Sequence, residues 1–181
     1  ANEDLINAGG VARAISLAAG EKFENECSEW IKNNGKLETG KAISVTAGDL
    51  PYSCIINVVG PTNGDKQMLE TSVLNTLREA EKQQLKSVCI PLISTGIFGF
   101  SLKQGCKVII NSVTKFLRKE ANLLQTVRIC NNKKSETNEL CKQLESIVGE
   151  SNSNLTIDVA KKKQSKPNPD AKYLWFWENE G

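Results

Sequence analysis

The sequence contains no histidine among its 181 residues. This absence removes the commonest general base of enzymes and the commonest metal ligand, because both roles usually fall to imidazole. The six cysteines include no Cys-x-x-Cys pair. Cys54, Cys89 and Cys130 each lie in an apolar, strand-like run, where a free thiol behaves as a small buried hydrophobe. We therefore expect reduced structural cysteines rather than disulfides or a metal site.

Long apolar runs and a strong net charge are also lacking. No segment approaches the ~18 consecutive apolar residues of a membrane helix, and none resembles a cleavable signal peptide. The formal net charge of +2 is too small to indicate nucleic-acid binding. We expect neither a membrane nor a nucleic acid as a partner, and the oligomeric state stays open. Hydrophobic residues at 39% and charged residues at 24% are ordinary for a globular protein.

Hydrophobic periodicity predicts helices alternating with short apolar strands. The predicted helices cover 11–19, 21–33, 65–85, 102–119 and 135–148, and the predicted strands lie within 41–51, 53–61, 87–93 and 126–132. This order indicates an α/β layered domain with a mixed, mostly parallel sheet, in which 87–93 is buried on both faces. No strand precedes the first helix, and a sheet normally has about five or six strands. We therefore expect the first strands to be missing from this fragment.

The composition changes after Gly149. Residues 150–172 are polar, lysine-bearing and interrupted by proline, which is typical of a linker. The lysine triplet at 161–163 is read as part of this linker, with a nuclear-targeting or nucleic-acid element as the alternative. Residues 173–181 begin with the aromatic run YLWFW. Because the chain begins with Ala1, we expect it to be a piece of a longer protein, with its folded domain at 1–149.

Two glycine-rich loops each precede a predicted helix, NAGGVA at 7–12 and STGIFGF at 94–100. Glycine permits close approach of backbone N–H groups, and the start of a helix adds partial positive charge. Two such loops facing each other would clamp a diphosphate, whereas a single glycine turn is usually plain topology. Neither loop carries the Gly-Lys-Ser/Thr of a Walker A loop or the GxGxxG pattern of a Rossmann site.

Three segments together resemble the macrodomain, an ADP-ribose-binding module, over roughly residues 1–148: ANEDL…AGGVARAISLAAG, INVVGP and PLISTGIFGF. The resemblance implies a three-layer α/β/α fold. Within the family, NEDL and the CNN…ET segment are similar to macrodomains of macrodomain-containing ADP-ribosyltransferases, the poly(ADP-ribose) polymerase family. The run at 173–181 resembles the first strand of a WWE domain, named for its Trp and Glu residues. An NAD⁺-dependent transferase domain of such a parent would lie beyond Gly181.

The resemblance also implies a role for each matching residue. Asn2 corresponds to the second asparagine of the family's Asn-Ala-Ala-Asn motif, near the distal ribose, and Phe100 flanks the same ribose. The remaining residues form the first phosphate loop (Gly9, Gly10, Val11), the floor of the cleft (Val59, Gly60, Pro61), the second phosphate loop (Ser94, Thr95, Gly96, Ile97, Phe98, Gly99) and the surroundings of the adenine (Asn131, Asn132). The family's adenine-contacting aspartate and its strand have no counterpart after Ala1.

One position separates a binding module from a hydrolase. Hydrolytic macrodomains of one large class carry Gly-Val-Asp in the first loop, and this chain has Ala12 in place of that aspartate. An alanine can neither orient nor deprotonate water. Glu3 and Asp4 are expected to be solvated or to cap a helix rather than to catalyse, although a ligand phosphate acting as base would need no protein acid.

We therefore expect a reader of ADP-ribose on mono- or poly-ADP-ribosylated proteins, with no catalytic residue, metal or cofactor, in the nucleus or the cytoplasm. The alternatives are a weak mono-ADP-ribosyl hydrolase and a scaffold without a ligand.

Overall fold

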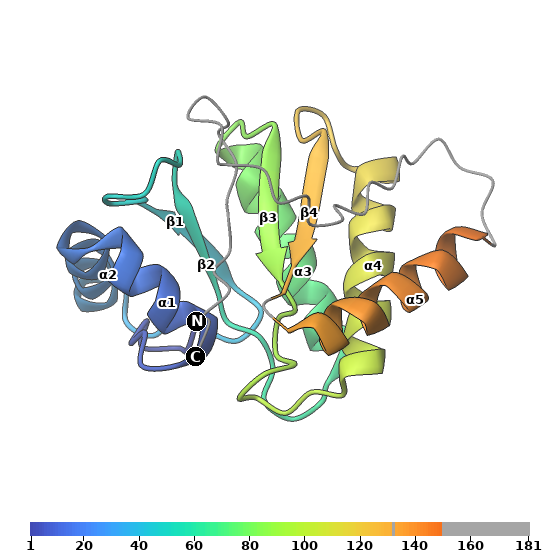
Figure 1. The fold of residues 1–181 in the computed structure, drawn as a ribbon. Coiled ribbons are helices and arrows are strands. Elements are labelled where there is room, and N and C mark those ends of the chain that lie inside the picture. The colour runs from blue at the N-terminus through green and yellow to red at the C-terminus, as the bar shows by residue number, and fades with distance from the viewer. Residues whose placement is uncertain (132, 150–181) are drawn as a thin grey trace, which may run out of the picture.

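The computed structural model describes residues 1–131 and 133–149. Its helices are α1 (Gly10–Ala19), α2 (Glu21–Asn34), α3 (Lys66–Lys82), α4 (Leu102–Lys119) and α5 (Lys134–Gly149). Its strands are β1 (Ala42–Val45), β2 (Ile55–Val58), β3 (Ser87–Pro91) and β4 (Thr126–Cys130), arranged as Figure 1 shows. The helices and strands predicted from the sequence are all confirmed, with small shifts at their ends. The predicted linker and aromatic segment lie outside the described residues.

The strands form two separate two-stranded sheets. β1 pairs with β2 in antiparallel fashion, and β3 pairs with β4 in parallel. The α/β fold class is confirmed, and the mixed arrangement of the described strands consists of one antiparallel and one parallel pair. The reason lies in the connections. Residues 46–54 join β1 to β2 without a helix, whereas α4 lies between β3 and β4 and provides the crossover that a parallel pair requires.

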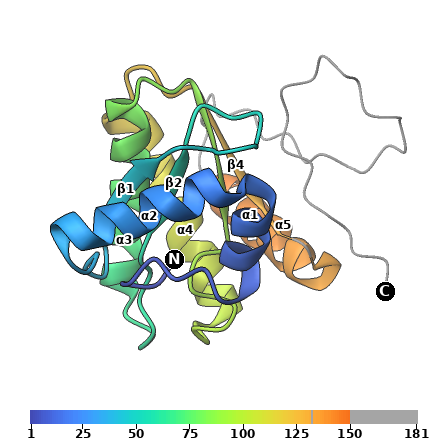
Figure 2. The same ribbon diagram turned by 90° about the vertical axis from the view of Figure 1, so that its left-hand side faces the viewer.

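Two hydrophobic cores lie on opposite faces of β1 and β2. Alternate strand residues point to opposite faces, so Ile43 and Val45 enter the smaller core together with Phe23 of α2. Ile56 and Val58 enter the larger core, which α3 and α4 build with β3 and β4. Figure 2 shows α2 lying in front of β1 and β2, with α3 behind them. The strands are thus sandwiched between two helix layers.

The burial of two elements differs from the prediction. On α1, only Ser16 and Ala19 are buried, while Val11 is 43% and Leu17 73% exposed. The apolar spacing shows which side of a helix is hydrophobic, but no other described element covers most of this side. In β3, Ile90 is buried, whereas Cys89 is only half-buried. Ile90 faces α3 and α4 in the larger core, and Cys89 points the opposite way. Burial on both faces is therefore not found.

The carboxylate of Glu79 on α3 is nearly buried and links α3 to β1. It accepts hydrogen bonds from Gln83 Nε2 at 3.0 Å, Ser44 Oγ at 2.8 Å and Lys82 Nζ at 3.3 Å. Burial raises the pKa of this carboxyl, but these hydrogen bonds outweigh the effect and hold the pKa below its ordinary value. A carboxyl whose pKa is lower in the folded chain contributes stability above its unfolded pKa, and that stability is lost as the pH falls through the folded value.

We expect Glu79→Gln to lower the free energy of unfolding by about 1 kcal/mol at pH 7, because a charged hydrogen-bond acceptor becomes neutral. At pH 4 the loss should be smaller, since the unfolded chain then binds a proton at this carboxyl and the stability that the lowered pKa contributes falls. Urea unfolding at both pH values measures the difference. Glu29→Gln, on an exposed position of α2, is the control and should change little at either pH. An equal loss at both pH values for Glu79→Gln would contradict the assignment.

Candidate functional site

The first glycine loop leads directly into α1. Gly9 is the N-cap residue in an extended conformation, and Gly10 begins the helix with φ +58°. No side chain caps this end of α1, so its first-turn N–H groups remain available to an anion. Asn2 Oδ1 accepts a hydrogen bond from Ile6 N at 2.8 Å and fixes the start of the loop. The local geometry is therefore that of an anion-accepting helix start.

The acids that precede this loop point away from it. Thr39 Oγ1 donates to Glu3 Oε1 at 3.1 Å, and Lys36 Nζ lies 3.3 Å from Asp4 Oδ2. The backbone oxygen of Glu3 also accepts from Leu37 N at 2.8 Å. Both carboxylates thus attach the N-terminal segment to residues 36–39.

The second glycine loop folds back on itself between β3 and α4. Ser94 adopts φ +65°, and its backbone oxygen accepts a hydrogen bond from Phe100 N at 3.0 Å. Thr95 Oγ1 donates to Leu92 O at 2.8 Å, and Gly99 N donates to Gly96 O at 2.9 Å. These bonds hold the loop in a tight turn, with Gly96 and Ile97 at its exposed tip.

The structure brings the two glycine loops into contact, as the sequence predicts. A methyl group on Gly9 would lie 3.0 Å from Cδ1 of Ile97, and one on Gly10 would lie 3.5 Å from the same atom. The cleft floor meets the second loop as well, since a methyl group on Gly60 would lie 2.3 Å from Ser94 Oγ. Three segments far apart in the sequence therefore converge at one place, beyond the carboxyl ends of β2 and β3.

Two buried polar atoms of the glycine-loop segments have no hydrogen-bond partner among the described residues, Asn7 Nδ2 and Ser94 Oγ. Asn7 is 9% exposed and Ser94 8%. An unpaired buried polar group is costly, and such a group in a native structure calls for an explanation such as a ligand or an ordered water. Asn7 is absent from the residues predicted from the sequence. The sequence feature that could have identified Asn7 is its position immediately before Ala8-Gly9-Gly10 in the first glycine loop.

The other predicted site residues divide into those at the loops and those apart from them. Val59 and Pro61 are buried beside Gly60, Val11 lies exposed at the start of α1, and Phe98 is half-buried in the second loop. Phe100 is 4% exposed and packs in the larger core, beneath the loop rather than on its surface. Asn131 lies at the end of β4, where its side chain donates to Glu136 of α5. Asn132 lies outside the described residues. These site assignments stay predictions.

The six cysteines are all free, as expected. Cys89 and Cys130 lie on the neighbouring strands β3 and β4, and Cys130 Sγ also lies 3.6 Å from Ile90 O. The hydrogen bond from the Cys130 thiol lowers the pKa of Cys89, with a further contribution from the Arg128 charge, and the same interaction raises the pKa of Cys130.

Within residues 1–131 and 133–149, no group of three His, Cys, Asp or Glu side chains is placed to hold a metal ion. No described helix is long and apolar enough to cross a membrane.

Comparison with known proteins agrees with this geometry. The Macro domain family model matches residues 1–109. The O-acetyl-ADP-ribose deacetylase of Escherichia fergusonii is 33% identical over 135 residues, 72% of this chain and 76% of the relative. The human protein mono-ADP-ribosyltransferase PARP14 is 37% identical over 118 residues, which are 62% of this chain. The chain covers only 7% of the human protein, and 23% of another relative.

The same family appears among solved structures. The Oceanobacillus iheyensis macrodomain with ADP superposes with a TM-score of 0.78 and 26% identity, covering 83% of each chain. The family model and the solved structure agree with each other, and the chain belongs to the Macro domain family.

Proposed function

We propose that this chain binds ADP-ribose, with the two glycine loops holding its diphosphate from both sides. The observation that carries the proposal is the contact of Gly9 and Gly10 with Ile97, together with the unpartnered polar atoms of Asn7 and Ser94 in the same two loop segments. Backbone N–H groups at the start of α1 supply donors for the phosphate oxygens. The Oceanobacillus iheyensis relative, described with ADP bound, supports this choice of ligand.

We further propose that the bound ADP-ribose is attached to proteins, so that the chain acts as a reader within a larger protein of the ADP-ribosyltransferase type. The similarity to human PARP14 supports such a parent. A WWE domain after the linker and a location in the nucleus or the cytoplasm are parts of the same proposal.

The alternative function is hydrolysis of the bond between ADP-ribose and its carrier. The deacetylase name of the Escherichia fergusonii relative favours it. Ala12, half-buried in the first turn of α1, argues against it because no carboxylate stands at this position to activate water. We expect a mono-ADP-ribosylated glutamate peptide, incubated with the chain, to keep its label. Release of label over many turnovers would overturn the reader proposal, and a chain that binds no ADP-ribose in calorimetry would instead be a scaffold.

The two unpartnered atoms give a test of the binding site that needs no charge change. We expect Ser94→Ala to leave the free energy of unfolding unchanged or slightly higher, because it removes a buried hydroxyl without a partner. The same variant should bind ADP-ribose about tenfold more weakly, the loss expected for about one hydrogen bond. Thermal unfolding and calorimetry measure the two effects.

Ser112→Ala is a suitable control, because the Ser112 hydroxyl is buried but donates to Val108 O at 2.7 Å. It should leave the affinity unchanged. If Ser94→Ala lowers stability and keeps the affinity, its hydroxyl has a partner within the protein and does not serve the ligand.

A further inference from the structure

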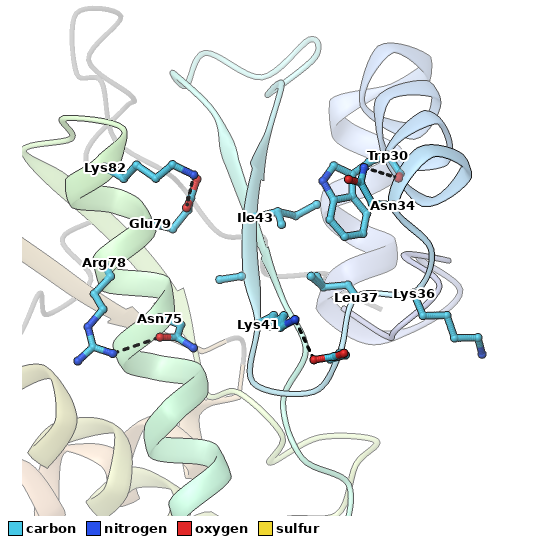
Figure 3. A pocket seen from close by; sticks show the side chains of 12 residues that line it. Trp30, Asn34, Lys36, Leu37, Lys41, Ile43, Asn75, Arg78, Glu79 and Lys82 are labelled. Carbon is cyan, nitrogen blue, oxygen red and sulfur yellow. Dashed lines mark hydrogen bonds and ion pairs between the residues drawn. The ribbon is translucent and has the colours of Figure 1, made fainter.

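A groove runs along the outer edge of β1, on a side of the molecule that the proposed ADP-ribose site does not include. Figure 3 shows β1 as its floor, α2 as one wall and α3 as the other. The hollow has a volume of about 510 Å³. None of the predicted ADP-ribose residues lines it.

The floor of this groove is an unpaired strand edge. Within residues 1–131 and 133–149, β1 pairs only with β2. Lys41 O accepts from Val59 N at 3.2 Å, so this residue's carbonyl points toward β2. Thr46 N donates to Glu26 Oε2 of α2 at 2.9 Å, so this N–H points away from β2. Because the direction alternates along a strand, the N–H and C=O groups of Ala42 and Ser44 point outward along the open edge.

The two walls differ in chemistry. On the α2 side, Trp30 and Ile43 are half-buried and border the smaller hydrophobic core, and Figure 3 shows Ile43 pointing toward Trp30. On the α3 side, Lys82 extends toward β1, whereas Arg78 turns away from β1 and pairs with Glu120 at the end of α4 (Figure 3). Successive side chains of a strand laid along β1 would face these walls in turn. The walls therefore favour a strand in which apolar and acidic residues alternate.

The charges on the rim favour an acidic partner over a second copy of the chain. Four cations line the groove against two carboxylates: Lys36, Lys41, Arg78 and Lys82 against Glu38 and Glu79. Each cation already contacts a carboxylate of this chain. On the α3 side, however, the cations are more exposed than their partners: the side chain of Lys82 is 73% exposed and that of Glu79 10%, and the side chain of Arg78 is 51% exposed and that of Glu120 32%. Antiparallel pairing of two β1 edges would place the Arg78 and Lys82 cations of both copies on the same face, where like charges repel.

We propose that the β1 edge groove binds an extended peptide segment of a partner protein by strand addition, in which acidic residues facing α3 alternate with apolar residues facing Trp30. Backbone hydrogen bonds to Ala42 and Ser44 supply the affinity, and the two walls select the sequence pattern. This site is separate from the proposed ADP-ribose site and independent of that function.

The test measures, by fluorescence anisotropy, how tightly the full 181-residue chain binds a labelled peptide in which glutamate and valine alternate. We expect binding that weakens as salt is raised, and at least about tenfold weaker binding of a peptide of the same composition with glutamates and valines in separate blocks. Binding should slow hydrogen exchange at the amides of Ala42 and Ser44, read by nuclear magnetic resonance. Saturating ADP-ribose should leave the peptide affinity unchanged.

Two variants make the test specific. Ser44→Pro removes an outward N–H and places a ring on the edge, so peptide binding should be lost while circular dichroism shows a folded chain. Lys82→Ala should weaken binding, whereas Lys107→Ala, at an exposed position of α4, should not. Equal binding of both peptides, unchanged exchange at Ala42 and Ser44, or a dimer that Ser44→Pro dissociates would each overturn the proposal. If Ser44→Pro unfolds the chain, the exchange measurement on the unaltered chain decides.

Discussion

Gly96→Glu should weaken ADP-ribose binding at least about 100-fold while the fold stays intact. Gly96 lies at the exposed tip of the second loop, where a methyl group would meet nothing within 4 Å and the backbone is not left-handed. The substitution therefore adds no strain to the free protein. It places a carboxylate where the proposed site holds a diphosphate, and like charges brought together in a binding site cost several kcal/mol. Calorimetry with ADP-ribose measures the loss, and thermal unfolding verifies the fold.

Two further variants at the same position separate charge from size. Gly96→Gln fills the same volume without charge and should lose less affinity than Gly96→Glu. Gly96→Ala should bind almost as the unaltered chain does. Should Gly96→Glu bind ADP-ribose within about threefold of the unaltered chain, the second loop would not be the phosphate site.

Gly48→Ala should lower the free energy of unfolding by about 3 kcal/mol or more. Gly48 follows β1 with φ +59°, and a methyl group there would lie 1.9 Å from the backbone oxygen of Ala19. The left-handed conformation costs an alanine about 1–2 kcal/mol, and overlap with a backbone atom in a packed region adds about 1–3 kcal/mol. Asp49 N donates to the same Ala19 oxygen at 2.8 Å, so relief of the overlap would disturb this hydrogen bond. Urea unfolding measures the loss.

Gly64→Ala is the matched control for this prediction. Gly64 also has a positive φ, +76°, but a methyl group there would meet nothing within 4 Å. It should show the conformational cost alone, about 1–2 kcal/mol. Equal losses in the two variants would show that residues around Ala19 move aside freely.

The sequence predicts burial most accurately in helices whose apolar residues recur at helical spacing. Phe23 and Cys27 on α2, and Ile109 and Phe116 on α4, are buried as their helical spacing indicates. The same reasoning is less successful for α1, because periodicity identifies an apolar side without saying what covers it. The direction of β1 relative to β2 is likewise set by a short connection rather than by the apolar pattern of either strand.

The candidate site shows the same division. Glycine-rich segments before helices predict both loops, since a helix start and close backbone approach are local properties. Asn7 becomes notable only when tertiary packing buries its side chain without a partner. The β1 edge groove combines residues of α2, β1 and α3 that have no common sequence pattern. Such features depend on which segments meet, and a single sequence does not encode this in any local signal.

The separation of the two sheets bears on how the domain unfolds. α1 and α2 pack in the smaller core and β3, β4, α4 and α5 in the larger, while β1 and β2 border both cores and α3 contacts β1, β2, β3 and α4. We therefore expect two partly independent unfolding units joined by β1, β2 and α3, and the amides of α3 should exchange most slowly. The contacts of Gly9 with Ile97 and of Gly60 with Ser94 cross the seam between these units. A ligand held there would bind both halves at once and make their unfolding more cooperative.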